Sequence, residues 1–117
     1  MERVPISKIG TTLFVSIQID LQDESVVRLQ EDLADELAAT GARGVIIDIT
    51  AMEIVDSFTG RMLATIGSIS RLFDAETVLV GMRPAVAITL TELGLSLRGV
   101  RTALNAEKGL ELLNGRA

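Results

Sequence analysis

Apolar residues recur along this chain with two different spacings, and each spacing predicts a kind of element. After Gly10 they occupy every second position, as in a β-strand: Leu13, Val15, Ile17 and Ile19. Residues 4–9 carry a weaker alternation, and Gly10 with Thr11 separates the two segments. Together the two segments predict a β-hairpin at the edge of a sheet.

Elsewhere the apolar residues lie three and four positions apart, which predicts four α-helices. The first covers residues 23–40, because acidic residues open it and Gly41 supplies a left-handed end. The other three helices are predicted over residues 57–73, 84–93 and 106–113.

Three further hydrophobic segments predict strands between these helices: residues 45–49, 77–81 and 100–104. The first is the most hydrophobic, which indicates a strand buried on both faces at the centre of a parallel sheet. The predicted order of elements is therefore β-β-α-β-α-β-α-β-α. Because helices connect the later strands, these strands pair mainly in parallel through right-handed crossovers. The fold class is α/β, with a mixed, mostly parallel sheet covered by helices.

The length of the chain limits its organisation. A chain of 117 residues can bury one core, so we expect a single domain over residues 1–117. Hydrophobic residues make up 48% of the chain, yet no unbroken apolar run approaches the ~20 residues of a membrane span. The first residues lack the basic and apolar pattern of a signal peptide. These features predict a soluble, cytoplasmic protein.

The composition excludes several kinds of chemistry. The chain has no Cys, which removes disulfides, thiolate nucleophiles and thiolate metal ligands. It has no His, so the usual base near neutral pH and the commonest metal ligand are missing. No Trp or Tyr occurs, and the net charge of −5 opposes binding to a phosphate backbone. We therefore expect no cofactor, no metal ion and no nucleic-acid partner.

Residues 55–61, Val-Asp-Ser-Phe-Thr-Gly-Arg, stand where the most hydrophobic strand gives way to the second helix. The first N–H groups of a helix have no partner within it, so a side-chain oxygen or a phosphate is favoured there. Ser57 therefore has two interpretations. It is either the N-cap of the helix, an ordinary role for Ser, or a phosphoacceptor.

The acidic residues and the serine at this junction also suggest catalytic chemistry. Asp48 and Asp56 follow the central strand, at the end where functional groups collect in α/β sheets. Without a glycine-rich phosphate loop or a His, Mg²⁺ binding is disfavoured, and Asp48 is predicted to hydrogen-bond the following loop. A hydrolase with Ser57 as its nucleophile would need Lys8 or Lys108 as base, and the chain order puts neither near it.

The order of elements and the Asp56-Ser57 pair resemble the STAS domain family, the anti-sigma-factor antagonists. In that family a partner kinase phosphorylates the serine of this pair, which implies a STAS fold and a phosphoacceptor at Ser57. Many members continue Asp-Ser-Ser-Gly, whereas this chain has Phe58 and Thr59 in the last two positions.

A closer resemblance within the family is to the scaffold proteins of the stressosome, which share Asp-Ser-Phe and then a small and a basic residue, here Gly60 and Arg61. The likeness runs through residues 13–18, 30–33, 84–87, 89–90, 92–94, 102–104 and 109–111. It implies a non-catalytic, oligomeric phosphoswitch. Its implied partners are an RsbT-like serine kinase, RsbR-like co-antagonists in a large assembly, and an RsbX-like phosphatase. Phosphorylation of Ser57 would release the kinase.

The residues around Ser57 are expected to contact these partners. Phe58 is either an apolar anchor for a partner or a core residue, and Arg61 can contact a partner's acidic group or the phosphate. Asp56 would repel a second negative charge, and Thr59 is either a second phosphoacceptor or a helix-surface residue. Two alternatives stay open: a general anti-anti-sigma factor that binds an anti-sigma kinase, and a STAS module that binds a small nucleotide.

Overall fold

The strands and helices follow one another along the chain in the predicted order, two strands first and then helices and strands in alternation. The computed structural model describes residues 4–18, 21–94 and 97–114. Its strands are β1 (Ile6–Ile9), β2 (Thr12–Ser16), β3 (Gly44–Asp48), β4 (Glu76–Val80) and β5 (Val100–Ala103). Its helices are α1 (Asp23–Thr40), α2 (Ser57–Leu72), α3 (Pro84–Glu92) and α4 (Ala106–Asn114).

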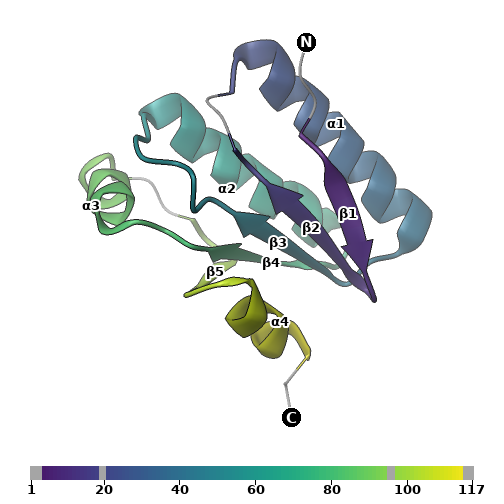
Figure 1. Cartoon of the computed structure of the whole chain (residues 1–117). Helices are drawn as coiled ribbons and strands as arrows, with labels where there is room; N and C mark the ends of the chain where they lie inside the picture. Colours follow the sequence, from purple (N-terminus) through teal and green to yellow (C-terminus); the bar gives the residue numbers. More distant parts are fainter. Residues whose placement is uncertain (1–3, 19–20, 95–96, 115–117) are drawn as a thin grey trace.

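The strands form one sheet in the order β1-β2-β3-β4-β5 (Figure 1). β1 and β2 pair antiparallel as the predicted hairpin, and every other neighbouring pair is parallel. β3 therefore lies at the centre of the sheet. The α/β class and the mixed, mostly parallel pairing are confirmed. Ile19, which the alternation assigned to the second strand, lies outside the described residues.

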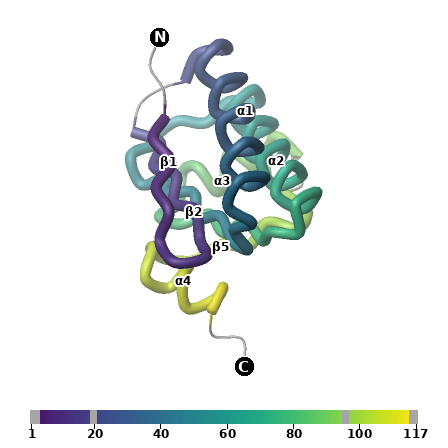
Figure 2. Tube along the Cα trace, turned by 90° about the vertical axis from the view of Figure 1, so that its right-hand side faces the viewer, coloured from purple at the N-terminus to yellow at the C-terminus, as the bar shows by residue number. Residues whose placement is uncertain are grey.

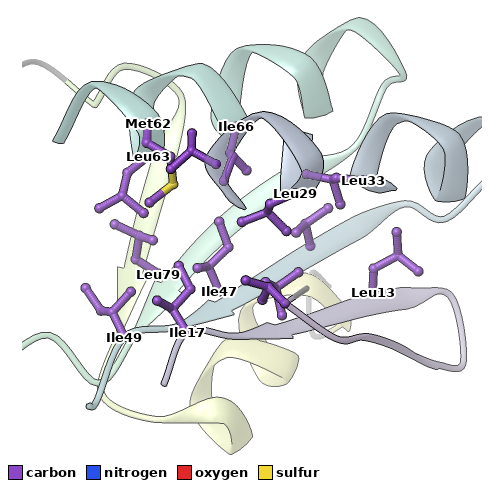
Figure 3. Close-up of a cluster of buried hydrophobic side chains, with 14 of the residues drawn as sticks. Leu13, Ile17, Leu29, Leu33, Ile47, Ile49, Met62, Leu63, Ile66 and Leu79 are labelled. Carbon is purple, nitrogen blue, oxygen red and sulfur yellow. The ribbon is translucent and has the colours of Figure 1, made fainter. Parts of the chain in front are cut away.

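The main core lies between one face of the sheet and helices α1, α2 and α3. Alternate residues of β2 and β3, with those that follow them, point into it: Leu13, Val15, Ile17, Val45, Ile47 and Ile49. From the helices come Leu29, Leu33, Met62, Leu63 and Ile66, which Figure 3 labels, together with Val86 and Leu90. Burial of this apolar surface, at about 25 cal/mol per Å², is the main stabilisation of the fold. It holds the strands, and therefore the loops that follow them, in fixed positions.

Helix α4 covers the opposite face of the sheet, apart from the other described helices (Figure 2). It packs on a smaller cluster formed by Ile46, Val78 and Val80. Gly109 permits this contact, because a Cβ atom there would lie 3.0 Å from Val80 Cγ1. β3 and β4 are thus buried on both faces, as the unbroken hydrophobic run at residues 45–47 predicts.

The observed bounds differ from the predicted ones by a single residue for most elements. β3 and β4 begin one residue earlier than predicted, at Gly44 and Glu76, which pair with each other. Neither has an apolar side chain, so the hydrophobic pattern did not include them. α2 ends at Leu72, one residue before the predicted Phe73, because the chain turns at Asp74, whose φ angle is 61°.

Candidate functional site

The loop between β3 and α2, residues 49–56, lies at the carboxyl edge of the parallel strands (Figure 1). The neighbouring strands hold its start: Ile49 N–H donates to Val80 O, and Ile17 N–H donates to Asp48 O, each at 3.0 Å. The chain segments after β2, β3 and β4 therefore meet at this edge, where functional sites collect in α/β sheets.

Asp48 stabilises the first turn of this loop. Its Oδ1 atom accepts hydrogen bonds from Thr50 N–H at 2.9 Å and from Thr50 Oγ1 at 2.6 Å. Arg83, just before α3, donates from Nε to Thr50 O at 2.9 Å and ties the loop to its neighbour. This is the loop role that the sequence predicts for Asp48. Within the described residues, no cluster of three or more acidic side chains is placed to hold a metal ion.

The N-cap of α2 is Asp56, so the interpretation of Ser57 as the N-cap is wrong. Asp56 has the extended backbone of an N-cap, and its Oδ1 atom accepts a hydrogen bond from Thr59 N–H at 2.9 Å. Its carbonyl oxygen accepts one from Gly60 N–H at 2.9 Å. Hydrogen bonds from Thr59, and to a smaller extent the charge of Arg61, hold the pKa of the Asp56 carboxyl below its ordinary value.

Ser57 is therefore the first helical residue of α2, and its side chain is half-buried. Its hydroxyl takes no part in the cap, which Asp56 and Thr59 form. The backbone N–H groups of Ser57 and Phe58 find no acceptor among the described backbone groups, as expected at the start of a helix. Two donors and the positive end of the helix dipole thus lie beside the hydroxyl, so the position can accommodate an added anion.

The other predicted site residues surround the first turn of α2. Phe58 is half-buried and packs against the main core. This agrees in part with the prediction that Phe58 is a core residue. Thr59 is half-buried as well, and its N–H is the one that Asp56 caps. Arg61 is exposed, one turn from Ser57, and no ion pair joins it to a described acidic group. The structure thus gathers all five predicted residues at one helix end.

A groove of about 580 Å³ opens beside this turn, between the segments that follow β2 and β3. Its lining residues are Ile17, Gln18, Leu21, Ala51, Met52, Glu53, Ile54, Asp56, Phe58 and Thr59. Ser57 is not among them, although its neighbours on both sides are. This groove was not predicted from the sequence, because residues such as Leu21 and Ile54 lie in connecting segments, where no periodicity distinguishes buried from exposed positions.

The two lysines that a hydrolase would need lie elsewhere in the molecule. Lys8 pairs with Leu13 at the amino end of β2, whereas Ser57 follows the carboxyl end of β3. Lys108 lies on α4, which packs on the opposite face of the sheet, and it forms an ion pair with Glu111 at 3.7 Å. Ser57 therefore has neither lysine beside it to act as a base.

The sequence profile of the STAS domain matches residues 3–107. The chain belongs to the STAS domain family. A Ser→Glu variant of Moorella thermoacetica RsbS has a solved structure that is 45% identical, with a TM-score of 0.85 and coverage of 96% of this chain and 95% of that one. A chain in a structure of the stressosome, described as a signal integration and transduction hub, is also 45% identical. Its TM-score is 0.85, with coverage of 95% of this STAS chain and 96% of its own.

A curated relative shares the STAS region but is much longer. RsbRA of Bacillus subtilis (strain 168), an RsbT co-antagonist protein, is 30% identical over 91 residues, which are 78% of this chain and 33% of RsbRA. The chain spans about a third of the length of the curated relatives it matches. The predicted resemblance to STAS antagonists, and among them to the scaffold proteins of the stressosome, which include RsbS, is confirmed. No helix in the described segments combines the length and hydropathy that a membrane span needs.

Proposed function

We propose that this STAS protein is an RsbS-like phosphoswitch and scaffold without catalytic activity of its own. It holds an RsbT-like serine kinase in an assembly with RsbR-like co-antagonists, and it releases the kinase when Ser57 is phosphorylated. The observation that carries the proposal is the position of Ser57 at the start of α2, with open amide donors beside a hydroxyl that the cap does not use. Because the kinase consumes ATP, the switch operates in the cytoplasm.

A phosphate on Ser57 is compatible with the fold. Phosphorylation adds about −1.5 to −2 charges at neutral pH. The amide groups of Ser57 and Phe58 and the helix dipole favour an anion at this place. Because Asp56 caps Thr59 without help from the modified hydroxyl, the first turn of α2 should persist after phosphorylation.

The same phosphate is expected to expel a bound kinase. A kinase that recognises the unmodified turn contacts a neutral hydroxyl next to the ionised Asp56. Phosphorylation places two anions side by side in that contact, and both must then lose water or repel acidic groups of the partner. A loss of about 1.4 kcal/mol already weakens binding tenfold. Binding is therefore expected to fail while the fold survives.

The named relatives support this choice of partners. RsbS is the similar protein with a solved Ser→Glu variant, and RsbRA is named for its antagonism of RsbT. In the proposed cycle, Phe58, Thr59 and Arg61 contact the kinase, since they surround Ser57 on the same turn. An RsbX-like phosphatase removes the phosphate and restores capture of the kinase.

The phosphoacceptor is tested with purified RsbT and Mg-ATP. Wild-type protein should gain one phosphate, located at Ser57 by mass spectrometry, and Ser57→Ala should gain none. Thr59→Ala is the matched control, because Thr59 carries the neighbouring hydroxyl of the same turn. It should still gain one phosphate at Ser57, although more slowly if the lost side chain contacts the kinase. Phosphate on Ser57→Ala at the wild-type level would remove Ser57 from the proposal.

The release step is tested by affinity measurements without ATP. Ser57→Glu should bind RsbT at least about tenfold more weakly than wild type, because a permanent charge replaces the hydroxyl. Ser57→Ala should bind like wild type. Both variants should keep the wild-type circular dichroism spectrum and a Tm within a few degrees. Equal affinities for Ser57→Glu and wild type would contradict a charge-controlled release.

The two alternative functions make different predictions. The groove beside the site presents carboxylates of Glu53 and Asp56, and no Lys or Arg is among its described lining residues, which opposes the phosphates of a nucleotide. Calorimetry with ATP and GTP should therefore show no binding. A general anti-anti-sigma factor would capture an anti-sigma kinase and not RsbT, so a parallel titration with both kinases distinguishes the two switch functions.

A further inference from the structure

The groove beside Ser57 is lined by apolar and acidic side chains, a combination that the start of a helix does not require. Its floor and walls include the apolar side chains of Ile17, Leu21, Met52 and Phe58. At its rim, Ile54 is 81% exposed. An apolar side chain inserted there would be covered on several sides and would cover Ile54 in turn.

The charges of the groove restrict what can occupy it. Among the described residues, its ionisable lining residues are Glu53 and Asp56, and both are acidic. The part of the lining that the structure describes contains no basic side chain that could neutralise them. Asp56 Oδ1 already accepts the hydrogen bond from Thr59, so its charge is held in place beside the groove. An occupant with a Lys or Arg next to its apolar side chain would complement this lining, and an acidic occupant would be repelled.

We infer that the groove docks a segment of the captured kinase that combines an apolar side chain with an adjacent Lys or Arg. This inference rests on the proposed function, because it assigns the groove to the kinase that Ser57 releases. Continuity supports the assignment: Asp56, Phe58 and Thr59 line the groove, and they flank the phosphoacceptor in the chain.

The arrangement separates docking from phosphorylation. Ser57 does not line the groove, although the residues before and after it do, so its hydroxyl is presented outside the hollow. One part of the kinase therefore occupies the groove while its active site reaches the hydroxyl alongside. Groove variants should accordingly raise KM for this protein as a substrate and leave kcat unchanged, since the docking contact is made in both ground and transition states.

The chain offers closely matched controls for this test. Ile54 is 81% exposed, and Leu72 and Leu104 are 85% and 78% exposed but do not line the groove. Ile54→Asp should weaken RsbT binding at least about tenfold, whereas Leu72→Asp and Leu104→Asp should change it by less than about twofold. Binding is measured by calorimetry without ATP. Because all three substituted side chains are exposed, the variants should retain the wild-type Tm.

The charge of the occupant is tested in the same way. Glu53→Lys should weaken RsbT binding, while Glu31→Lys, on the exposed side of α1, makes the same change in net charge outside the groove and should not. Salt should weaken the wild-type complex and have less effect on the Glu53→Lys complex.

The possible results distinguish a failure of the proposed function from a failure of the docking inference. If wild type does not bind RsbT, the proposed function fails. If wild type binds and Ile54→Asp binds equally well, only the docking inference is overturned. If Ile54→Asp instead abolishes self-association in analytical ultracentrifugation and leaves RsbT binding intact, the groove holds a second copy of this chain, which also overturns the inference.

Discussion

Helices α1 and α2 both begin at the carboxyl edge of the sheet, but their first turns carry different charges. α1 has Asp23 and Glu24 in its first turn, and its N-cap residue, Gln22, forms no capping hydrogen bond through its side chain. α2 has no acidic residue in its first turn and is capped by Asp56. α1 therefore complements its dipole with carboxylates inside the helix, whereas α2 places its carboxylate just before it.

This difference indicates where a phosphate can be added without damage. A phosphate on the first turn of α1 would meet two carboxylates in that turn, and the repulsion would oppose it. The first turn of α2 offers an uncharged Ser57 with open backbone donors, and Arg61 follows one turn later. The start of α2 can therefore change between a neutral and a charged state, whereas the start of α1 is permanently charged.

The largest expected effect is a loss of thermal stability when the N-cap side chain of α2 is removed, compared with the same change at the N-cap of α1. Asp56→Ala removes the hydrogen bond from Thr59 N–H and should lower Tm by about 4 °C, the usual effect of a lost cap in a domain of this size. Gln22→Ala is the matched control and should lower Tm by less than about 1 °C, because Gln22 makes no capping bond. Calorimetry measures both values. Similar losses in the two variants would show that the helices do not differ in their capping.

A second prediction concerns pH. The pKa of Asp56 is below its ordinary value in the fold, so its ionised form contributes stability above the unfolded pKa. That contribution is lost as the pH falls below about 4, through the lower folded pKa. Asp56→Asn keeps a capping acceptor without the charge. Wild type should therefore be more stable than Asp56→Asn at neutral pH, and this difference in stability should shrink in acid.

Phosphorylation sharpens this pH test. A phosphate on Ser57 is an anion beside Asp56, so it should raise the pKa of that carboxyl and move the loss of stability to higher pH. Urea unfolding at a series of pH values, with and without prior treatment by the kinase, measures the change. A stability difference that does not vary with pH in either state would rule out a role for the charge on Asp56.

Most of the fold could be predicted from periodicity, because burial imposes it. The alternation at Leu13, Val15 and Ile17 reports a strand with one face on the main core, and the run at residues 45–47 reports a strand buried on both faces. The bounds were less accurate where a residue belongs to a strand through its backbone alone. Gly44 and Glu76 pair with each other and contribute no apolar side chain to the pattern.

The candidate site was predictable in place but not in detail. Ser and Asp are both good N-caps and are adjacent here, so only the hydrogen bond between Asp56 and Thr59 shows which residue caps the helix. The groove depends on how the segments after β2 and β3 approach each other, which the sequence pattern does not contain. Ile54 is an apolar loop residue in the sequence, and its exposure at a groove rim follows only from the structure.

The smallest expected effect concerns Arg61 in the phosphorylated protein. Arg61 lies four residues after Ser57 on α2, a spacing at which an ion pair contributes about 0.3–0.5 kcal/mol. It should therefore favour the dianionic phosphate, and Arg61→Gln should raise the second pKa of the phosphate by about 0.2–0.4 units. A ³¹P NMR titration measures this pKa, with Arg71→Gln, in the last turn of the same helix, as the control that leaves it unchanged.

The outcome of that titration bears directly on the contrast between the helices. α1 already has Arg28 at the same four-residue spacing from Glu24, so its anion and its cation are both permanent. In α2 the cation is permanent and the anion exists only after phosphorylation. A shifted phosphate pKa in Arg61→Gln would mean that the modified α2 reproduces the charge arrangement of α1. An unshifted one would mean that Arg61 does not pair with the phosphate and that the modified α2 lacks this arrangement.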